Sequence, residues 1–147
     1  MTLTSVYKRP DRHELLYRLL AERDETINIS HRAMPAFCQH VAFVESKPYT
    51  AWYFITDGDE VLGACYLSKQ NELGVHLLRT SQGRGYGKRA IEEMVRIHGP
   101  RRYLANINPR NERSAAMFAG LGFRLCQHTF ELNEPAPGHQ GLRESDL

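Results

Sequence analysis

The residues from Asn71 to Lys88 constrain the fold of this chain most, because an extended run ends there in a glycine-rich turn. Residues 72–79 read as a strand, the glycines at 83, 85 and 87 alternate with long side chains, and a helix-like run spans 89–98. Glycine reaches backbone conformations closed to other residues, and a helix start offers unpaired N–H groups and the positive end of its dipole. This order predicts a cradle for a phosphate group.

Two familiar phosphate-binding loops do not fit this turn. A Walker loop needs a glycine five residues before its Gly-Lys pair and Ser or Thr after it, whereas this chain has Gln82 and Arg89 there. The dinucleotide fingerprint Gly-x-Gly-x-x-Gly also fails, since positions 88 and 90 are Lys and Ala. The pattern that remains is Gln82-x-x-Gly85-x-Gly87.

Composition limits the remaining function classes. The chain has 147 residues, enough for one domain with its own core and too few for two. A net charge of +2 is too small to predict a nucleic-acid partner. Arg84, Lys88 and Arg89 nevertheless form a basic cluster at the glycines, which favours anion binding over a merely solvated helix start.

The cysteine and histidine patterns predict no metal site. Cysteines stand at 38, 65 and 126, with wide spacings and no Cys-x-x-Cys pair, and the seven histidines lack metal-ligand spacing. No apolar run is long enough to span a membrane, so we expect no membrane partner. A reducing cytoplasm is the default expectation for the location of such a chain.

Hydrophobic periodicity and turn residues predict a strand, two helices, three antiparallel strands, and then helix, strand, helix and strand. The expected strands span residues 2–7, 50–56, 60–68, 72–79, 103–107 and 123–132, and the expected helices start at residues 11 and 34 or span 85–98 and 108–120. The strand at 103–107 should run parallel to that at 72–79, because a helix connects them. Residues 24–33 read as a loop, and the Pro- and Gly-containing residues 133–147 as a poorly ordered tail.

Two sequence patterns, in this order, resemble the GNAT family of N-acetyltransferases. The pattern Gln82-x-x-Gly85-x-Gly87 is similar to the family's acyl-CoA loop. Residues 108–123, Asn-Pro-Arg-Asn-Glu-Arg-Ser-Ala-Ala-Met-Phe-Ala-Gly-Leu-Gly-Phe, resemble its Asn-x-x-Ser…Leu-Gly-Phe signature. The resemblance implies one acetyltransferase domain over residues 1–132. Its fold is α+β, with a mixed, mostly antiparallel sheet that is splayed at the central strands and flanked by four helices.

The resemblance also implies a reaction. Acetyl-CoA would be the co-substrate, and its acetyl group would pass to a primary amine by direct attack through a tetrahedral intermediate. We expect a small-molecule acceptor: an amino sugar, an amino acid or a polyamine-like amine. Two alternatives stay open: a non-catalytic acyl-CoA-binding sensor or partner module, and a protein N-terminal or lysine acetyltransferase. The oligomeric state also stays open, with a homodimer among the expectations.

The residues expected to bind the co-substrate follow from the same resemblance. The turn would hold the pyrophosphate, the backbone at the end of the 72–79 strand would pair with the pantetheine arm, and the last helix would add polar and packing contacts. A backbone N–H near Leu77 or Leu78 would serve as the oxyanion donor. The cofactor-binding candidates are Leu77, Leu78, Arg79, Gln82, Gly83, Arg84, Gly85, Tyr86, Gly87, Lys88, Asn111, Ser114 and Phe118.

Glu72 and His76 are the catalytic candidates. A primary alkylamine has a pKa of about 10.4, so only about one molecule in a thousand is neutral near pH 7 and a base must help. Relatives often carry a carboxylate that acts through water at the position of Glu72. Period-two alternation puts His76 on the same face of the strand. The alternatives are a solvated glutamate at a turn and a histidine satisfied within the sheet.

Phe118 stands where the family often has a tyrosine that protonates the departing thiolate. Phenylalanine cannot donate a proton, so the acid is unassigned. A thiol with a pKa of about 8.5 leaves as the thiolate at pH 7 for roughly 2 kcal/mol, which water or another residue could supply. We expect Trp52, Tyr53, Tyr66 and the loop at 24–33 to line the acceptor pocket.

Overall fold

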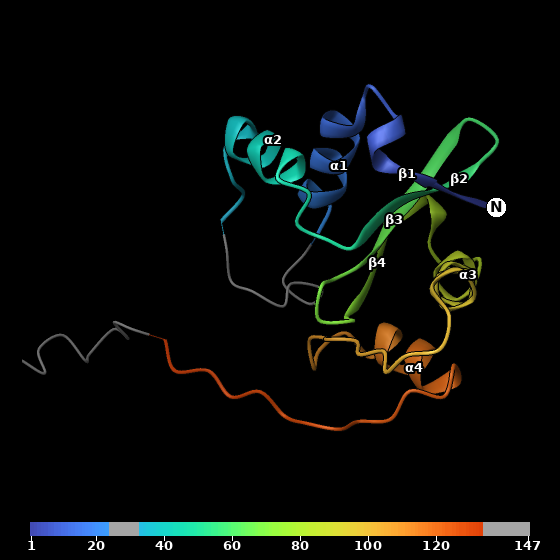
Figure 1. Cartoon of the computed structure of the whole chain (residues 1–147). Helices are drawn as coiled ribbons and strands as arrows, with labels where there is room; N and C mark the ends of the chain where they lie inside the picture. Colours follow the sequence, from blue (N-terminus) through green and yellow to red (C-terminus); the bar gives the residue numbers. More distant parts are fainter. Residues whose placement is uncertain (24–32, 134–147) are drawn as a thin grey trace, which may run out of the picture.

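Four strands form one antiparallel sheet at the centre of the chain (Figure 1). This computed structural model describes residues 1–23 and 33–133. The strands are β1 (Thr2–Ser5), β2 (Ala51–Asp57), β3 (Glu60–Leu67) and β4 (Leu73–Leu77), and they pair in the order β1-β2-β3-β4. A hairpin turn at Gly58 joins β2 to β3, as its φ of 60° and the Asp-Gly-Asp sequence require.

Helices cover both faces of the sheet, with α1 and α2 on one side and α3 and α4 on the other (Figure 1). The helices are α1 (Arg12–Ala21), α2 (Phe37–Glu45), α3 (Tyr86–His98) and α4 (Glu112–Gly120), with short 3-10 turns η1 (Val6–Lys8) and η2 (Arg79–Ser81). The α+β class and the four flanking helices are therefore confirmed. The last helix begins at Glu112 rather than at residue 108, because Asn111 N–H bonds back to Asn108 O in a turn.

The two faces of the sheet build two separate cores. On the side of α1 and α2, the side chains of Val6, Leu16, Leu19, Val44, Phe54, Ala64 and Leu78 pack together. On the side of α3 and α4, the cluster contains Ile55, Leu62, Cys65, Leu67, Leu73, Ala90, Ile91, Met94 and Phe118. Neighbouring residues of β2 thus face opposite cores, as the period of a strand dictates.

β4 is an edge strand with one short contact on its free side. A single parallel bridge joins Glu72 to Leu104, and Leu73 N–H donates to Leu104 O at 2.7 Å. The predicted parallel direction is confirmed, but the prediction of a strand at 103–107 is wrong. Leu104 pairs with this edge through its N–H to Asn71 O and its O to Leu73 N–H, and the next contact, from Asn106 Nδ2 to the Glu72 carboxylate, joins side chains and not backbones. The sheet therefore stays open beside β4.

The predicted closing strand at 123–132 is also wrong. The described residues 123–133 form no strand, and Leu125, Phe130 and Leu132 are 79%, 93% and 78% exposed. A strand needs an edge to pair with, and residues 103–107 do not supply one. In Figure 1 this segment runs along and away from the helices. The predicted tail, apart from Asn133, and the predicted loop at 24–33, apart from Ala33, lie outside the described residues.

Candidate functional site

Two glycines give the turn before α3 its shape. Gly83 and Gly85 have φ values of 79° and 80°, in the left-handed region that other residues avoid. Gly85 is the N-cap of α3, and within the described part of the chain no side chain caps this helix. No described atom lies within 4 Å of the position that a Cβ on Gly85 would take. The start of α3 is therefore left without a capping side chain among the described residues, as an anion site requires.

Gly87 has a different task, which is close packing. A Cβ at this position would lie 3.2 Å from Met117 Sδ of α4 and 3.7 Å from Leu77 Cδ1 of β4. The missing side chain thus lets the first turn of α3 approach both neighbours. The turn is held beside the end of β4 for this reason.

Gln82 ties the cradle to the two elements beside it. Its Nε2 donates to Leu77 O at 3.2 Å, and its Oε1 accepts from Arg113 Nη1 at 3.1 Å. A Cβ at Gly83 would lie 3.2 Å from Arg113 Nη2. Arg113 therefore brings a guanidinium from α4 to the turn. The sequence prediction missed Arg113, although it directly precedes Ser114 within the second family signature.

The remaining cradle residues surround the turn with positive charge. Arg84, Lys88 and Arg89 are exposed. Arg89 lies over the ring of Tyr86, with its Cζ 5.7 Å from the ring centroid. Together with Arg113, these side chains create a positive field where the α3 dipole also favours an anion.

Beside the cradle, β4 has an edge that no strand covers among the described residues. In an antiparallel pair, alternate residues point their N–H and C=O groups to opposite edges. Leu73 bonds Leu104 across the free edge, so Val75 and Leu77 face that same edge. Among the residues that the structure describes, no strand covers them there. A ligand with amide groups could add to this edge as a further strand.

The three backbone positions expected to bind the pantetheine arm differ in their partners. Leu77 faces the free edge. Leu78 N–H points the other way and donates to Leu62 O at 2.9 Å. Arg79 N–H donates to Glu22 Oε2 at 3.2 Å. Leu77 is thus the member of this trio whose N–H faces the open side.

A cavity of about 730 Å³ lies against the face of the sheet that α1 and α2 cover, and it extends to the first turns of α4. Its wall is aromatic: the rings of Tyr49 and Tyr66 stack at 4.1 Å, and Trp52 meets Tyr49 edge-on at 4.8 Å. Trp52 and Tyr66 line this cavity as predicted. Tyr53 was placed there wrongly, because it points to the other face and its hydroxyl contacts His98 Nε2 at 3.2 Å.

Gly74 of β4 makes room for this aromatic wall. It pairs across the strands with Tyr66, and a Cβ on Gly74 would lie 2.3 Å from the Tyr66 ring. The ring therefore lies flat over the backbone of β4. This places the Tyr66 hydroxyl over the strand that carries both catalytic candidates.

Glu72 is held at the start of β4 by two polar side chains. Its Oε1 accepts from Ser68 Oγ at 3.2 Å, and its Oε2 accepts from Asn106 Nδ2. Asn106 itself lines the cavity, and so does His76, which shares a strand face with Gly74. His76 thus lies in the wall of the cavity, whereas Glu72 is outside the lining and is connected to it through Asn106.

The last helix supplies the far end of the cavity through Asn111, Ser114 and Phe118. Asn111 is also the N-cap of α4, since its Oδ1 accepts from Ser114 N–H at 3.2 Å. Phe118 is 5% exposed and meets Phe123 edge-on at 5.0 Å. These three residues therefore combine a structural role with a position at the site.

Burial shifts the pKa of several groups in the cavity. It raises the pKa of Tyr49 to about 12 and also raises the pKa of Tyr66. Burial lowers the pKa of His40, whose Nε2 lies 3.0 Å from His13 O. At neutral pH both tyrosine hydroxyls are therefore protonated donors, and the His40 ring is uncharged.

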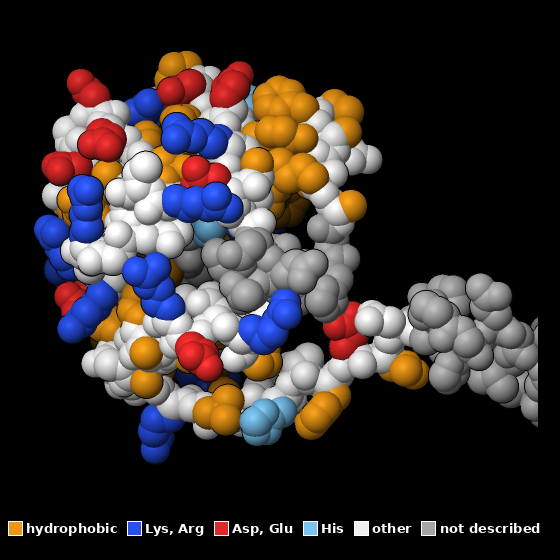
Figure 2. Space-filling model, turned by 180° about the vertical axis from the view of Figure 1, so that it is seen from behind, with side chains coloured by type: hydrophobic (Ala, Val, Ile, Leu, Met, Phe, Trp, Pro, Cys, Tyr) orange, Lys and Arg blue, Asp and Glu red, His pale blue; other side chains and the backbone are white. Residues whose placement is uncertain are grey.

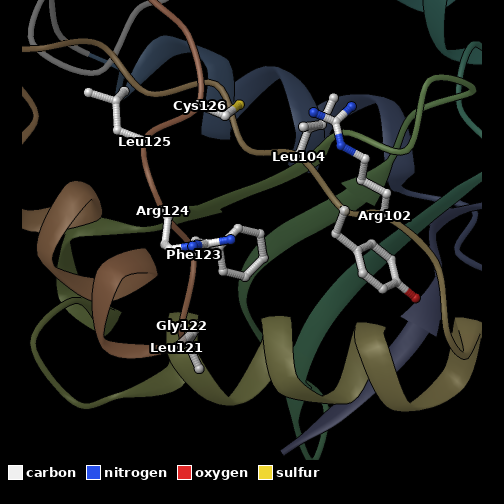
Figure 3. A pocket seen from close by; sticks show the side chains of 9 residues that line it. Arg102, Leu104, Leu121, Gly122, Phe123, Arg124, Leu125 and Cys126 are labelled. Atoms are coloured by element: carbon white, nitrogen blue, oxygen red, sulfur yellow. The ribbon is translucent and has the colours of Figure 1, made fainter.

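A second cavity, of about 500 Å³, lies between residues 102–104 and residues 121–126 (Figure 3). Figure 3 shows the two chain segments passing this space with Phe123 and Arg124 between them. The predicted strands at 103–107 and 123–132 would have met here. None of the described residues that line this space is Asp, Glu or His, and His76 is the catalytic candidate that lines the larger cavity.

Neither a metal site nor a membrane span is found in the described part of the chain. No group of three or more His, Cys, Asp or Glu side chains there could hold a metal ion. None of the helices over residues 1–23 and 33–133 has the length and apolar character to cross a bilayer.

Solved structures with the same architecture come from several microorganisms. A domain from Methanocaldococcus jannaschii matches with a TM-score of 0.75 and 16% identity, over 88% of this chain and 92% of that chain. An acetyltransferase from Thermus thermophilus matches with a TM-score of 0.65 and 23% identity, over 84% of this chain and 86% of that chain.

A third neighbour is a GNAT superfamily phosphinothricin acetyltransferase from Sinorhizobium meliloti, solved in complex with AcCoA. It has a TM-score of 0.64 and 21% identity over 86% of this chain and 76% of that chain. At such identities these likenesses establish the fold. No significant match was found among curated proteins. The model of the acetyltransferase (GNAT) family matches residues 14–123, most of the sequence. The chain therefore belongs to the GNAT acetyltransferase family.

Proposed function

We propose that this protein is an N-acetyltransferase that moves the acetyl group of acetyl-CoA to a primary amine of a small molecule. One observation carries the proposal: β4 has a carboxylate at its start, the cavity against its face, and the phosphate cradle just beyond its end. A single strand thus connects the group that can accept a proton with the site that can hold the co-substrate.

The residues of the cradle fit the diphosphate of acetyl-CoA. The open N-terminus of α3 and the guanidinium of Arg113 would hold its charge, and the free edge at Val75 and Leu77 would bond the amides of its arm. When bound, acetyl-CoA supplies an acetyl thioester. Leu77 N–H is then the better placed oxyanion donor, since Leu78 N–H already bonds Leu62 O.

Glu72 is the proposed general base. Its carboxylate accepts hydrogen bonds from Ser68 and Asn106, and Asn106 lines the cavity, so we expect a proton from the amine to reach Glu72 through water. His76 lines the same cavity and is the second candidate. General base catalysis contributes on the order of 10²- to 10⁴-fold to such rates.

The second candidate function is a non-catalytic acyl-CoA-binding module. Phe118 favours it, because a buried phenylalanine packed on Phe123 cannot protonate a departing thiolate. Residues 1–132 are proposed as one acetyltransferase domain. A homodimer and a cytoplasmic location stay predictions; the exposed apolar residues Leu125, Phe130 and Leu132 support the former. Light scattering on the purified chain measures the oligomeric state.

The two functions separate in one experiment. Release of free thiol from acetyl-CoA is followed with a panel of amines, for the wild type and for Glu72→Gln, which keeps the size and hydrogen-bonding reach of the side chain. Glu93→Gln is the control, since Glu93 pairs with Arg96 on α3, far from the cavity. We expect turnover that falls by on the order of 10²-fold in Glu72→Gln alone. Tight CoA binding without turnover on any amine would favour the binding module.

A further inference from the structure

Arg23 brings a positive charge to the wall of the cavity. Of the described residues that line the cavity, Arg23 alone is fully charged, and none is Asp or Glu. Its Nε is buried, and no hydrogen-bond acceptor within the described residues reaches it. Leaving a buried donor atom unpaired is costly, so the Nε of Arg23 is a candidate donor to a bound ligand.

Arg23 lies in the part of the cavity that contains Tyr49 and Tyr66. It follows the last turn of α1, where its N–H donates to Leu20 O at 3.3 Å. Its charge lowers the pKa of Tyr49 and Tyr66, against the larger effect of burial, whereas Glu72 acts on the same two hydroxyls with the opposite sign. A guanidinium and a carboxylate therefore both lie near the same pair of hydroxyls.

Beside the Tyr49 and Tyr66 hydroxyls the cavity has an apolar wall. Tyr49, Trp52 and Phe43 meet edge-to-face, with ring centroids between 4.8 and 6.1 Å apart. In Figure 2, hydrophobic side chains gather over α2 beside a hollow in the surface. Met34, Phe37 and Phe43 are the exposed members from this part of the chain. An apolar group of the acceptor would find its contacts here.

From this arrangement we propose that the acceptor is a free amino acid with an aromatic or long apolar side chain. Its carboxylate would pair with Arg23, its amino group would lie toward Glu72, and its side chain would pack on Tyr49, Trp52 and Phe43. The inference rests on the acetyltransferase function proposed above and names its substrate class. A polyamine is disfavoured because it would add positive charge beside Arg23, and an amino sugar offers no negative charge to it.

The chemical step balances without a further reactant. The amine nitrogen forms one bond to the acetyl carbon, and the carbon–sulfur bond of the thioester breaks. The ammonium form of the amino acid loses two protons in all: one to the medium by way of Glu72, and one that reaches the sulfur of the released thiol. The product is an N-acetyl amino acid.

The test compares substrates that differ only at the carboxylate: L-phenylalanine, L-phenylalaninamide and phenethylamine, with spermidine as the polyamine. Thiol release and the mass of the product are measured with the full chain and saturating acetyl-CoA. We expect kcat/KM for phenylalanine to exceed that for phenethylamine by on the order of 10- to 100-fold, as a charged, bidentate pair allows. This comparison needs no variant.

Variants then assign the effect to one side chain. Arg23→Gln should lower kcat/KM for phenylalanine by on the order of 10- to 100-fold while leaving phenethylamine and the KM of acetyl-CoA unchanged, and Arg23→Lys should recover part of the loss. Arg18→Gln is the matched control, because Arg18 belongs to α1 and lies outside the cavity lining.

The outcomes separate the two proposals. Turnover of phenethylamine or spermidine equal to or better than that of phenylalanine would overturn the amino-acid inference and leave the acetyltransferase function standing. An equal loss in Arg23→Gln for both substrates would also overturn it. CoA binding without turnover of any amine would overturn the inference together with the proposed function.

Discussion

The cradle and the acceptor cavity are built in opposite ways. The cradle consists mainly of consecutive residues, 82–88, whose backbone N–H groups and φ values make the site. The cavity is assembled from side chains of α1, α2, β3, β4 and α4 that are distant in the sequence. From this difference we expect the cradle to contribute equally to the reaction with every acceptor, whereas the cavity should determine which acceptor is used.

The largest effect should come from the turn itself. Gly85→Val places a β-branched residue at a φ of 80° and fills the space before α3. We expect kcat/KM for acetyl-CoA to fall by on the order of 100-fold, equally for every acceptor. Gly99→Val, at the other end of α3 with a φ of 74°, should reduce stability without this loss. If the fall in kcat/KM for acetyl-CoA differed from one acceptor to another, the cradle would not act independently of the acceptor cavity.

A steric change at Gly74 tests the cavity in the same way. Gly74→Ala would bring a Cβ to 2.3 Å from the Tyr66 ring and displace the aromatic wall. We expect a loss of about 1–3 kcal/mol in the free energy of unfolding, as overpacking costs, and a higher KM for the amine only. Chemical denaturation measures the first and steady-state kinetics the second. In Gly120→Ala, where no described atom lies within 4 Å, the free energy of unfolding should not fall, since alanine favours a helix over glycine, and the KM for the amine should stay the same.

Arg113 should have a smaller effect, because it is one of several cations at the cradle. Arg113→Gln removes its charge and its bond to Gln82. We expect the KM of acetyl-CoA to rise by about 10-fold, and the rise should shrink at high salt. Arg96→Gln removes one positive charge from the far end of α3 and is the control. Equal effects of the two substitutions would mean that net charge, and not the site, is responsible.

The smallest effect concerns pH. Burial lowers the pKa of His40 in the folded chain below its unfolded value of about 6.5, so the unfolded chain binds more protons below that pH. Stability should therefore be complete above about pH 6.5 and decline as the pH falls below it. His40→Gln should flatten this decline, as measured by chemical denaturation between about pH 5 and 7. An unchanged slope would show that other groups, such as His98, produce it.

The sequence predicted the parts of the molecule in which local signals agree. Periodicity and turn residues predicted the four strands β1 to β4 and the four helices. They also predicted the glycines with left-handed φ values in the cradle. The strands predicted at 103–107 and 123–132 failed together. Residues 103–107 and 123–132 each have the composition of a strand. A strand also needs a neighbouring segment to pair with, and neither of these two segments provides a strand edge for the other.

The candidate site divides along the same line. The aromatic residues of the predicted strands pointed to Trp52 and Tyr66, but strand alternation should have excluded Tyr53, because neighbouring residues face opposite cores. Arg23 looks like an ordinary charge near a helix end, and Tyr49 lies outside the predicted strands. Their proximity arises from tertiary structure, which no local pattern carries.

The most direct test of the account is the affinity for CoA, measured by isothermal titration calorimetry beside pantetheine, which lacks the diphosphate. If the N-terminus of α3 holds the diphosphate, CoA should bind at least about 100-fold more tightly than pantetheine, and Gly85→Val should reduce CoA to the affinity of pantetheine. Equal binding of the two ligands by the wild type, or full CoA affinity in Gly85→Val, would contradict it.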